Sequence, residues 1–290
     1  MNPVNVASLS RWIAFKSILV CICVLSPVLV SAEDLKSTSL YGIGDEDINF
    51  KSYRPSYFGY RVSHSNKDNE GEIKFQLSLK YQVTRSDVFE DKLYANKVLS
   101  NWYFGYTQKS FWSIQKNSAP FRESNFSPEF FKEAHFSEWD SVDVFKFLRF
   151  GLYQHESTGE AGIGSHGWNL TYIEPVWKFS DLTLAPKIWV PVLFTSKENA
   201  APDNVDIFDY YGYGEIKLAY DQSRSLRHSL MYRQGKDSDK YGFQWQTDFA
   251  FNWDKLNPKI FFQYWSGFGE SLKDYNNNTN GLVLGLSAVY

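Results

Sequence analysis

Three side chains near the middle of the chain have the types and spacing of an acyl-transfer centre. His155 and Ser157 lie two residues apart, and Asn169 follows after a short glycine-rich segment. On a β-strand, residues i and i+2 share a face, so the imidazole and the hydroxyl would lie side by side. A serine can attack an acyl carbon when an imidazole accepts its proton, and a third group holds the ring in one tautomer. The pattern predicts a nucleophile, a base and an orienting amide.

The segment between Ser157 and Trp168 contains four glycines. Such a flexible connection would let the next strand return alongside, which would bring Asn169 within reach of His155. A histidine two residues before a serine also arises by chance, and the bland interpretation is a barrel-wall or loop histidine followed by a turn serine. The spacing alone leaves both interpretations open.

The elements that must position these residues are predicted by a period of two. From Ile73 to Val83 apolar and polar residues alternate at every position, and Leu282–Tyr290 alternates on one face and ends on an aromatic residue. This period predicts strands with one apolar face. Further aromatic or β-branched runs predict strands at Tyr94–Gln108, Asp143–Ser157, Trp168–Lys178, Leu182–Phe194, Gly212–Tyr220, Ser225–Arg233, Gly242–Asn252 and Lys259–Gly267.

Composition narrows the class of protein. The 290 residues are 43% hydrophobic, 18% aromatic and 22% charged, with a formal net charge of −3. The chain is too polar for a bundle of membrane helices and too hydrophobic for a disordered protein. Its negative charge argues against nucleic acid as a partner. The abundance of Trp and Tyr suits the aromatic girdles of a membrane barrel.

The N-terminus has the layout of a secretory signal peptide. Residues 1–32 contain Arg11 and Lys16, no acidic residue, an apolar run and a final Val-Ser-Ala, and the run is too short to span a bilayer as a helix. Both cysteines lie in this segment, so residues 33–290 cannot be stapled by disulfides. We expect those residues to form one all-β domain, a transmembrane antiparallel β-barrel of roughly 10–14 strands. A secreted soluble β-sandwich is the alternative.

Three separated segments resemble one bacterial family. Gly151–Gly159 followed by Ser165–Asn169 is similar to the active-site hairpin of the outer membrane phospholipase A family. Tyr106–Ser110 with Ser118–Asn125 resembles the family's segment before that hairpin, and Tyr264–Tyr275 resembles its penultimate strand and following turn. The similarity runs from about Tyr106 to the C-terminus.

The resemblance implies a twelve-stranded barrel in the bacterial outer membrane, with its active site on the outer wall near the outer leaflet. Such a protein is a carboxylic ester hydrolase that acts on phospholipids and lysophospholipids, uses calcium and is active as a homodimer. Carried over by position, Ser157 is the nucleophile, His155 the base and Asn169 the orienting residue.

The resemblance also implies a calcium site and an oxyanion hole. The ligands would be Ser165, the backbone oxygen of Glu160 and Ser118 of the partner subunit, all of them the oxygens that this hard cation prefers. A calcium-bound water and the Gly159 amide would stabilise the oxyanion. Gln108 would either bridge the dimer or face the barrel interior, and both remain open.

The chain departs from the family's pattern around this site. Thr158 stands where the family has Asn, Glu160 where it has Arg, and His166 and Gly167 where it has Arg and Ser. A backbone ligand tolerates a side-chain change. The alternative function is a non-enzymatic outer-membrane barrel, a pore or a structural protein, with an inert hairpin. A lipid A deacylase is a weaker enzymatic variant.

Overall fold

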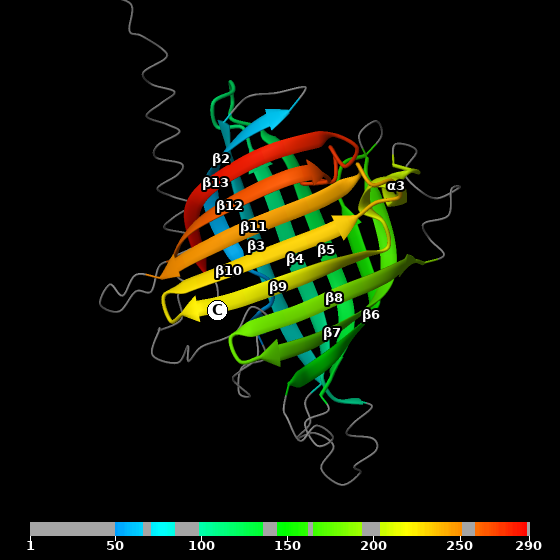
Figure 1. Ribbon diagram of the computed structural model, residues 1–290. Helices are drawn as coiled ribbons and strands as arrows, with labels where there is room; N and C mark the ends of the chain where they lie inside the picture. The colour runs from blue at the N-terminus through cyan, green and yellow to red at the C-terminus, as the bar shows by residue number, and fades with distance from the viewer. Residues whose placement is uncertain are drawn as a thin grey trace, which may run out of the picture.

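The computed structural model describes residues 50–65, 71–84, 99–135, 144–161, 165–192, 204–250 and 259–288. Within them the strands form one antiparallel sheet, and Figure 1 shows it curled into a barrel. The strand β3 pairs with both β2 and β4, and this pairing closes the sheet on itself. The predicted signal peptide, residues 1–32, lies outside the described residues.

The bounds of the elements are β1 (Phe50–Ser52), β2 (Ser56–Ser65), β3 (Gly71–Thr84), β4 (Trp102–Trp112), β5 (Phe121–Ala134), β6 (Phe145–Ser157), β7 (Gly167–Phe179), β8 (Leu182–Pro191), α3 (Ile207–Tyr211), β9 (Gly214–Ser223), β10 (Leu226–Gln234), β11 (Tyr241–Ala250), β12 (Lys259–Phe268) and β13 (Asn278–Ala288). Both β1 and β2 pair with β3, at Phe50↔Tyr81 and at Tyr57↔Gln76. They form one interrupted strand, so the wall has twelve strands and the expected antiparallel barrel is confirmed. Among the described residues, no helix is long and apolar enough to cross a membrane.

The two faces of the sheet are the reverse of those of a water-soluble barrel. On β3, Lys74 and Lys80 are each 1% exposed, whereas Tyr81 and Val83 on the opposite face are exposed. On β13 a large apolar side chain also faces outward, since Leu284 is 61% exposed. Large apolar side chains on the outside and charges on the inside are the pattern of a barrel that faces lipid.

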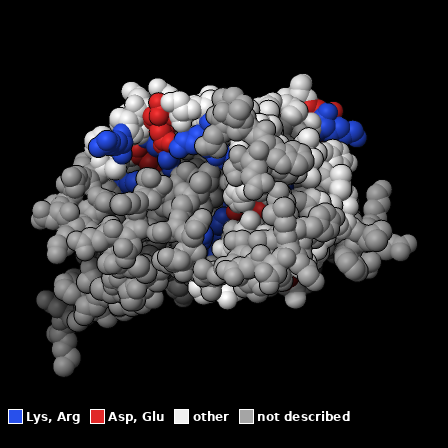
Figure 2. All heavy atoms as spheres, turned by 90° about the horizontal axis from the view of Figure 1, so that it is seen from below, with Lys and Arg blue, Asp and Glu red and all other residues white. Residues whose placement is uncertain are grey.

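Ion pairs between neighbouring strands, and between strands and the turn after β12, satisfy charges inside the barrel. Arg61 on β2 bonds to Glu72 at 2.8 Å and to Glu270, which also accepts from Lys74 Nζ at 3.0 Å. Glu270 lies in the turn after β12. Burial alone would raise its pKa, but Lys74 and Arg61 outweigh burial and hold the pKa well below its ordinary value. In the view from below, described charges of opposite sign lie next to one another (Figure 2).

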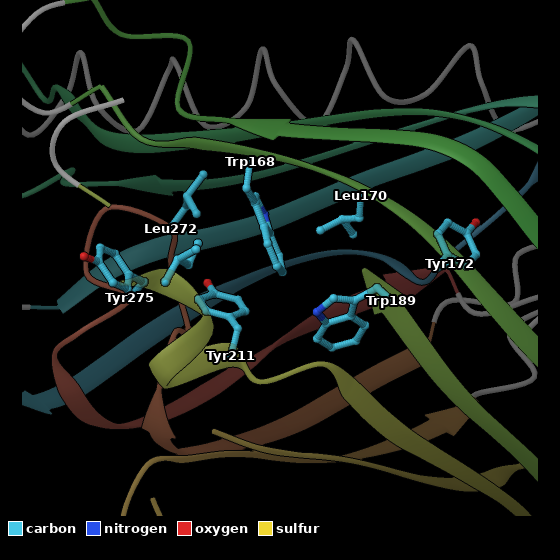
Figure 3. Close-up of a cluster of buried hydrophobic side chains, with 8 residues drawn as sticks. Trp168, Leu170, Tyr172, Trp189, Tyr211, Leu272 and Tyr275 are labelled. Carbon is cyan, nitrogen blue, oxygen red and sulfur yellow. The ribbon is translucent and has the colours of Figure 1, made fainter. Parts of the chain in front are cut away.

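An aromatic cluster fills the barrel interior behind β7. Its buried members are Trp168, Leu170, Tyr172, Trp189, Ile207, Tyr211, Leu272 and Tyr275. Figure 3 shows the short helix α3 and the turn after β12 bringing Tyr211, Leu272 and Tyr275 against the side chains of β7 and β8. This packing supports β7 from inside, and β7 carries Asn169.

Candidate active site

The hairpin of β6 and β7 brings the base and the orienting amide together. His155 is directly opposite Asn169 in the strand register, and Ser157 is opposite Gly167. His155 Nδ1 lies 2.7 Å from Asn169 Oδ1. Because a carbonyl oxygen only accepts hydrogen bonds, Nδ1 carries the proton and Nε2 is left to accept one. That is the tautomer that a general base requires.

Ser157 lies two residues beyond His155, on the same face of β6. The described contacts include no hydrogen bond between the Ser157 hydroxyl and His155. In substrate-free active sites such a contact is often long or absent and forms only in the complex with substrate. The structure therefore brings His155 and Asn169 into contact and places Ser157 next to them.

A β-bulge decides which way these side chains point. The register of β6 shifts between Gly151 and Gln154 against β7, and it also shifts against β5 at the same level. Leu152 and Tyr153 are consecutive, yet both are exposed, at 50% and 39%. The bulge thus places two neighbouring side chains on the outer face.

Beyond the bulge the even-numbered residues face inward. Gln154 Oε1 accepts from Lys187 Nζ at 2.8 Å, and Glu156 Oε2 accepts from Trp168 Nε1 at 2.9 Å. His155 and Ser157 therefore face outward. Before the bulge Phe147 and Arg149 are buried, so uninterrupted alternation would have turned His155 and Ser157 into the barrel. A regular alternation with a period of two therefore does not predict the face on which His155 and Ser157 lie.

On the outer face Asn169 has a second polar neighbour, Tyr153, which the sequence alone does not identify. The hydroxyl of Tyr153 donates to Asn169 Oδ1 at 2.7 Å, the same oxygen that His155 contacts. The sequence signal was an aromatic residue two positions before the histidine, which belongs on the same face of the strand.

The loop after β6 is held closed next to Ser157. The backbone N–H of Thr158 donates to the carbonyl of His166 at 2.9 Å. Gly159 follows with φ +69°, and a Cβ added to it would lie 2.8 Å from Phe126 on β5. Phe126 is itself the register partner of Ser157. Only glycine fits this position, two residues from Ser157.

Gly159→Ala should therefore slow acyl transfer without unfolding the barrel. The methyl group collides with Phe126 and favours a negative φ, which turns the backbone N–H that the resemblance assigns to the oxyanion. We expect a loss of about 10- to 100-fold in kcat, less than the ~10²–10³ of a deleted oxyanion donor. Steady-state kinetics and a thermal melt check this, and Phe126→Leu should restore part of the activity. Full activity of Gly159→Ala would show that the Gly159 N–H does not stabilise the oxyanion.

The three residues that the resemblance assigns to calcium lie at the same end of the barrel. Ser118, at φ +65°, is in the turn from β4 to β5, and Glu160 and Ser165 flank the loop from β6 to β7. The Glu160 carboxylate pairs with Lys273 Nζ at 3.1 Å, so it points to the turn after β12. The part of the chain that the structure describes contains no group of three His, Cys, Asp or Glu side chains suited to a metal.

Gln108 lies on the outer face of β4. It accepts from the Tyr106 hydroxyl and donates to Ser110 Oγ, both at 3.1 Å, and shares its face with the exposed Phe104. In the register Gln108 is opposite Phe126, which is opposite Ser157. The alternative that Gln108 faces the interior is wrong, because Lys109 occupies that face and donates to the Glu270 carbonyl.

Comparison with known proteins gives one consistent result. The family model described as Phospholipase A1 matches residues 48–288. A putative phospholipase A1 of Neisseria meningitidis serogroup B is 31% identical over 225 residues, which are 76% of this chain and 55% of that protein. Phospholipase A1 of Escherichia coli K12 is 30% identical over 224 residues, 74% of this chain and 68% of that protein. The chain thus spans about half the length of the Neisseria relative.

Solved structures agree on the fold. Outer membrane phospholipase A from Escherichia coli matches with a TM-score of 0.69 at 24% identity, covering 89% of this chain and 98% of that one. The Salmonella typhi outer membrane phospholipase dimer with bound calcium matches with a TM-score of 0.70 at 23% identity, covering 86% and 97%. At this identity the two structures establish the barrel architecture.

Proposed function

Because the chain belongs to the phospholipase A1 family, a family of carboxylic ester hydrolases, we propose that it hydrolyses acyl ester bonds of phospholipids and lysophospholipids. The observation that carries this proposal is the 2.7 Å contact of His155 Nδ1 with Asn169 Oδ1, on the outer wall beside Ser157. A bilayer lipid can reach a nucleophile on that wall by lateral diffusion, without leaving the membrane.

The side chains divide the reaction as follows. Ser157 Oγ attacks the ester carbonyl carbon while His155 Nε2 accepts its proton, and Asn169 Oδ1 keeps the Nδ1–H in place. The imidazolium then returns the proton to the departing alcohol, which leaves as a lysophospholipid or a deacylated product. Water, deprotonated by the same imidazole, hydrolyses the acyl-serine and releases a fatty acid. The Gly159 N–H would donate to the oxyanion in both halves.

Calcium would be held at the mouth of the same loop. The donors would be the Ser165 hydroxyl, the Glu160 carbonyl and Ser118 of the partner subunit, and an all-oxygen set of this kind fits the cation. The closed Thr158–His166 contact supports the fit, because it keeps both ends of the loop beside Ser157. When bound, the cation would add positive charge near the developing oxyanion.

Dimerisation would complete this site and limit the activity. A lipase that is always active would degrade the membrane around it, so a need for the partner's ligand is a physical safeguard. Gln108, on the outer wall two strands from Ser157, would contact the partner. The calcium-containing dimer of the Salmonella typhi protein supports this arrangement by analogy. We further propose that residues 1–32 are cleaved on export to the outer membrane.

The barrel interior favours the enzyme over the alternative of a pore. Large charged side chains are buried inside the barrel in pairs such as Lys80–Glu133 at 3.0 Å. The aromatic cluster behind β7 occupies the end near the site. Within the described part of the chain, large buried side chains thus occupy the interior, which we take to favour an enzyme over a pore.

Fatty-acid release from phosphatidylethanolamine in mixed micelles tests the proposal. Refolded residues 33–290 should release fatty acid with calcium, and excess chelator should lower the rate to near background. Ser165→Ala should shift half-maximal activation to higher calcium concentration. Release that ignores the chelator would retain the triad and refute the calcium site. No release from a folded, dimer-competent barrel would favour the non-enzymatic alternative.

A further inference from the structure

We infer that Tyr153 is a positioning residue of the active site, which fixes the carboxamide of Asn169 so that its oxygen faces His155. This inference rests on the proposed function and adds a fourth side chain to it. Tyr153 does not touch the reacting atoms; it acts through Asn169.

The contacts of a single oxygen atom carry the inference. Asn169 Oδ1 lies 2.7 Å from His155 Nδ1 and 2.7 Å from the Tyr153 hydroxyl, which donates to it. A carbonyl oxygen has two lone pairs, so it can accept both hydrogen bonds at once. Both donors reach it from β6, whereas Asn169 itself is on β7.

The bulge in β6 is what brings Tyr153 to this atom. Leu152 and Tyr153 both face outward, so Tyr153, His155 and Ser157 form one outward row beyond the bulge. The irregularity that keeps the triad on the lipid-facing wall therefore also supplies the hydroxyl that bonds to Asn169.

An uncharged orienting residue needs this help more than a carboxylate does. Both oxygens of a carboxylate accept hydrogen bonds, so either can face the imidazole. A carboxamide offers one acceptor and one donor group, and after a flip its NH₂ would donate to Nδ1. Nε2 would then carry the ring proton and could not accept one from Ser157. A hydroxyl that donates to Oδ1 opposes this flip.

The same hydroxyl also has an opposing effect. A donor to Oδ1 withdraws electron density and makes that oxygen a weaker partner for the imidazolium. If this effect prevailed, removing the hydroxyl would speed the reaction. If orientation prevails, as we infer, removing it slows the reaction, so the sign of the change separates the two.

Tyr153→Phe is the test, measured as fatty-acid release by the full mature chain in phosphatidylethanolamine micelles with calcium. We expect kcat to fall about threefold to tenfold, the effect of one net hydrogen bond, with KM unchanged. In an Asn169→Ala background the same substitution should change kcat by less than about twofold, because the group it positions is gone. Melting temperature and heat-modifiable migration should match those of the parent.

The chain offers a matched control for the loss of a wall hydroxyl. Tyr264 on β12 also donates to an asparagine on the next strand, Asn280, at 3.4 Å. Tyr264→Phe should leave kcat unchanged. If the wild type is active, two results would overturn the inference. One is a kcat of Tyr153→Phe that equals or exceeds that of the wild type. The other is a loss of kcat that is equally large in the wild-type and Asn169→Ala backgrounds. No release by the wild type would overturn the proposed function and this inference together.

Discussion

Ser157→Ala is expected to abolish fatty-acid release and to leave the barrel folded. The substitution removes the oxygen that would form the acyl-enzyme, and Ser157 is the only serine in β6. We expect kcat to fall by about 10⁴-fold or more, the usual result of removing a triad nucleophile. His155→Ala should cost a similar factor, and the double variant should be no worse than either single one.

Ser266→Ala is the matched control for this experiment. Ser266 lies on the outer face of β12, where its hydroxyl is 3.2 Å from that of Tyr241. Ser266→Ala should keep wild-type activity. This result would show that the loss in Ser157→Ala comes from the missing nucleophile and not from the removal of any serine on the outer face of the barrel. Residual hydrolysis above about one hundredth of wild type in Ser157→Ala would assign the nucleophile to another residue.

Leu284→Arg is expected to destabilise the barrel in a lipid bilayer. Leu284 is near the middle of β13 and is 61% exposed, so in water an arginine there would be harmless. On the lipid-facing side of a barrel, arginine at the bilayer midplane costs about 2–4 kcal/mol. We expect the free energy of unfolding in phosphatidylcholine vesicles, from urea titrations of tryptophan fluorescence, to fall by that amount.

The position of the charge along the strand supplies the control. Asn280 lies on the same outer face of β13, near the start of the strand. Asn280→Arg should cost only about 0–1 kcal/mol, because the penalty declines toward the interface. Equal effects of the two substitutions, or none from either, would show that this wall does not face the bilayer core.

Strands with strict alternation could be predicted from the sequence. The expected strand Ile73–Val83 lies within β3, and Lys259–Gly267 corresponds to β12. In Ile73–Val83 one face is apolar and the other polar, whereas Lys259–Gly267 is predicted by its aromatic run, since Phe261 and Trp265 lie on its inner face. The strand expected from Tyr94 begins at Trp102, and residues 85–98 lie outside the described part of the chain.

The strands β2 and β5 are absent from those that the alternation predicts. In β5, Pro128 lies in the middle of the strand, and acidic residues such as Glu129 and Glu133 lie on the inner face. A proline within a run argues against a strand, and buried acids do not look like a core. Their partners are far away in sequence: Glu129 pairs with Arg54, and Glu133 with Lys80. Local patterns cannot contain such pairs.

In the candidate site, too, local sequence predicts some features and not others. The pairing of His155 with Asn169 follows from spacing, because a glycine-rich loop returns one strand along the other. The face on which they lie does not follow, because the bulge at Leu152 and Tyr153 shifts the alternation by one residue. The partner of Glu160 was equally hidden, since Lys273 lies in a turn more than a hundred residues away.

The most direct test of the account is to map the adduct of a long-chain alkyl fluorophosphonate on the folded barrel by mass spectrometry. The reagent esterifies only a serine activated by a neighbouring base, and its alkyl chain partitions into the micelle with the outer wall. We expect one adduct per chain, on the peptide that contains Ser157, and none in His155→Ala. An adduct on another residue, or no adduct under conditions that label a known serine hydrolase, would contradict it.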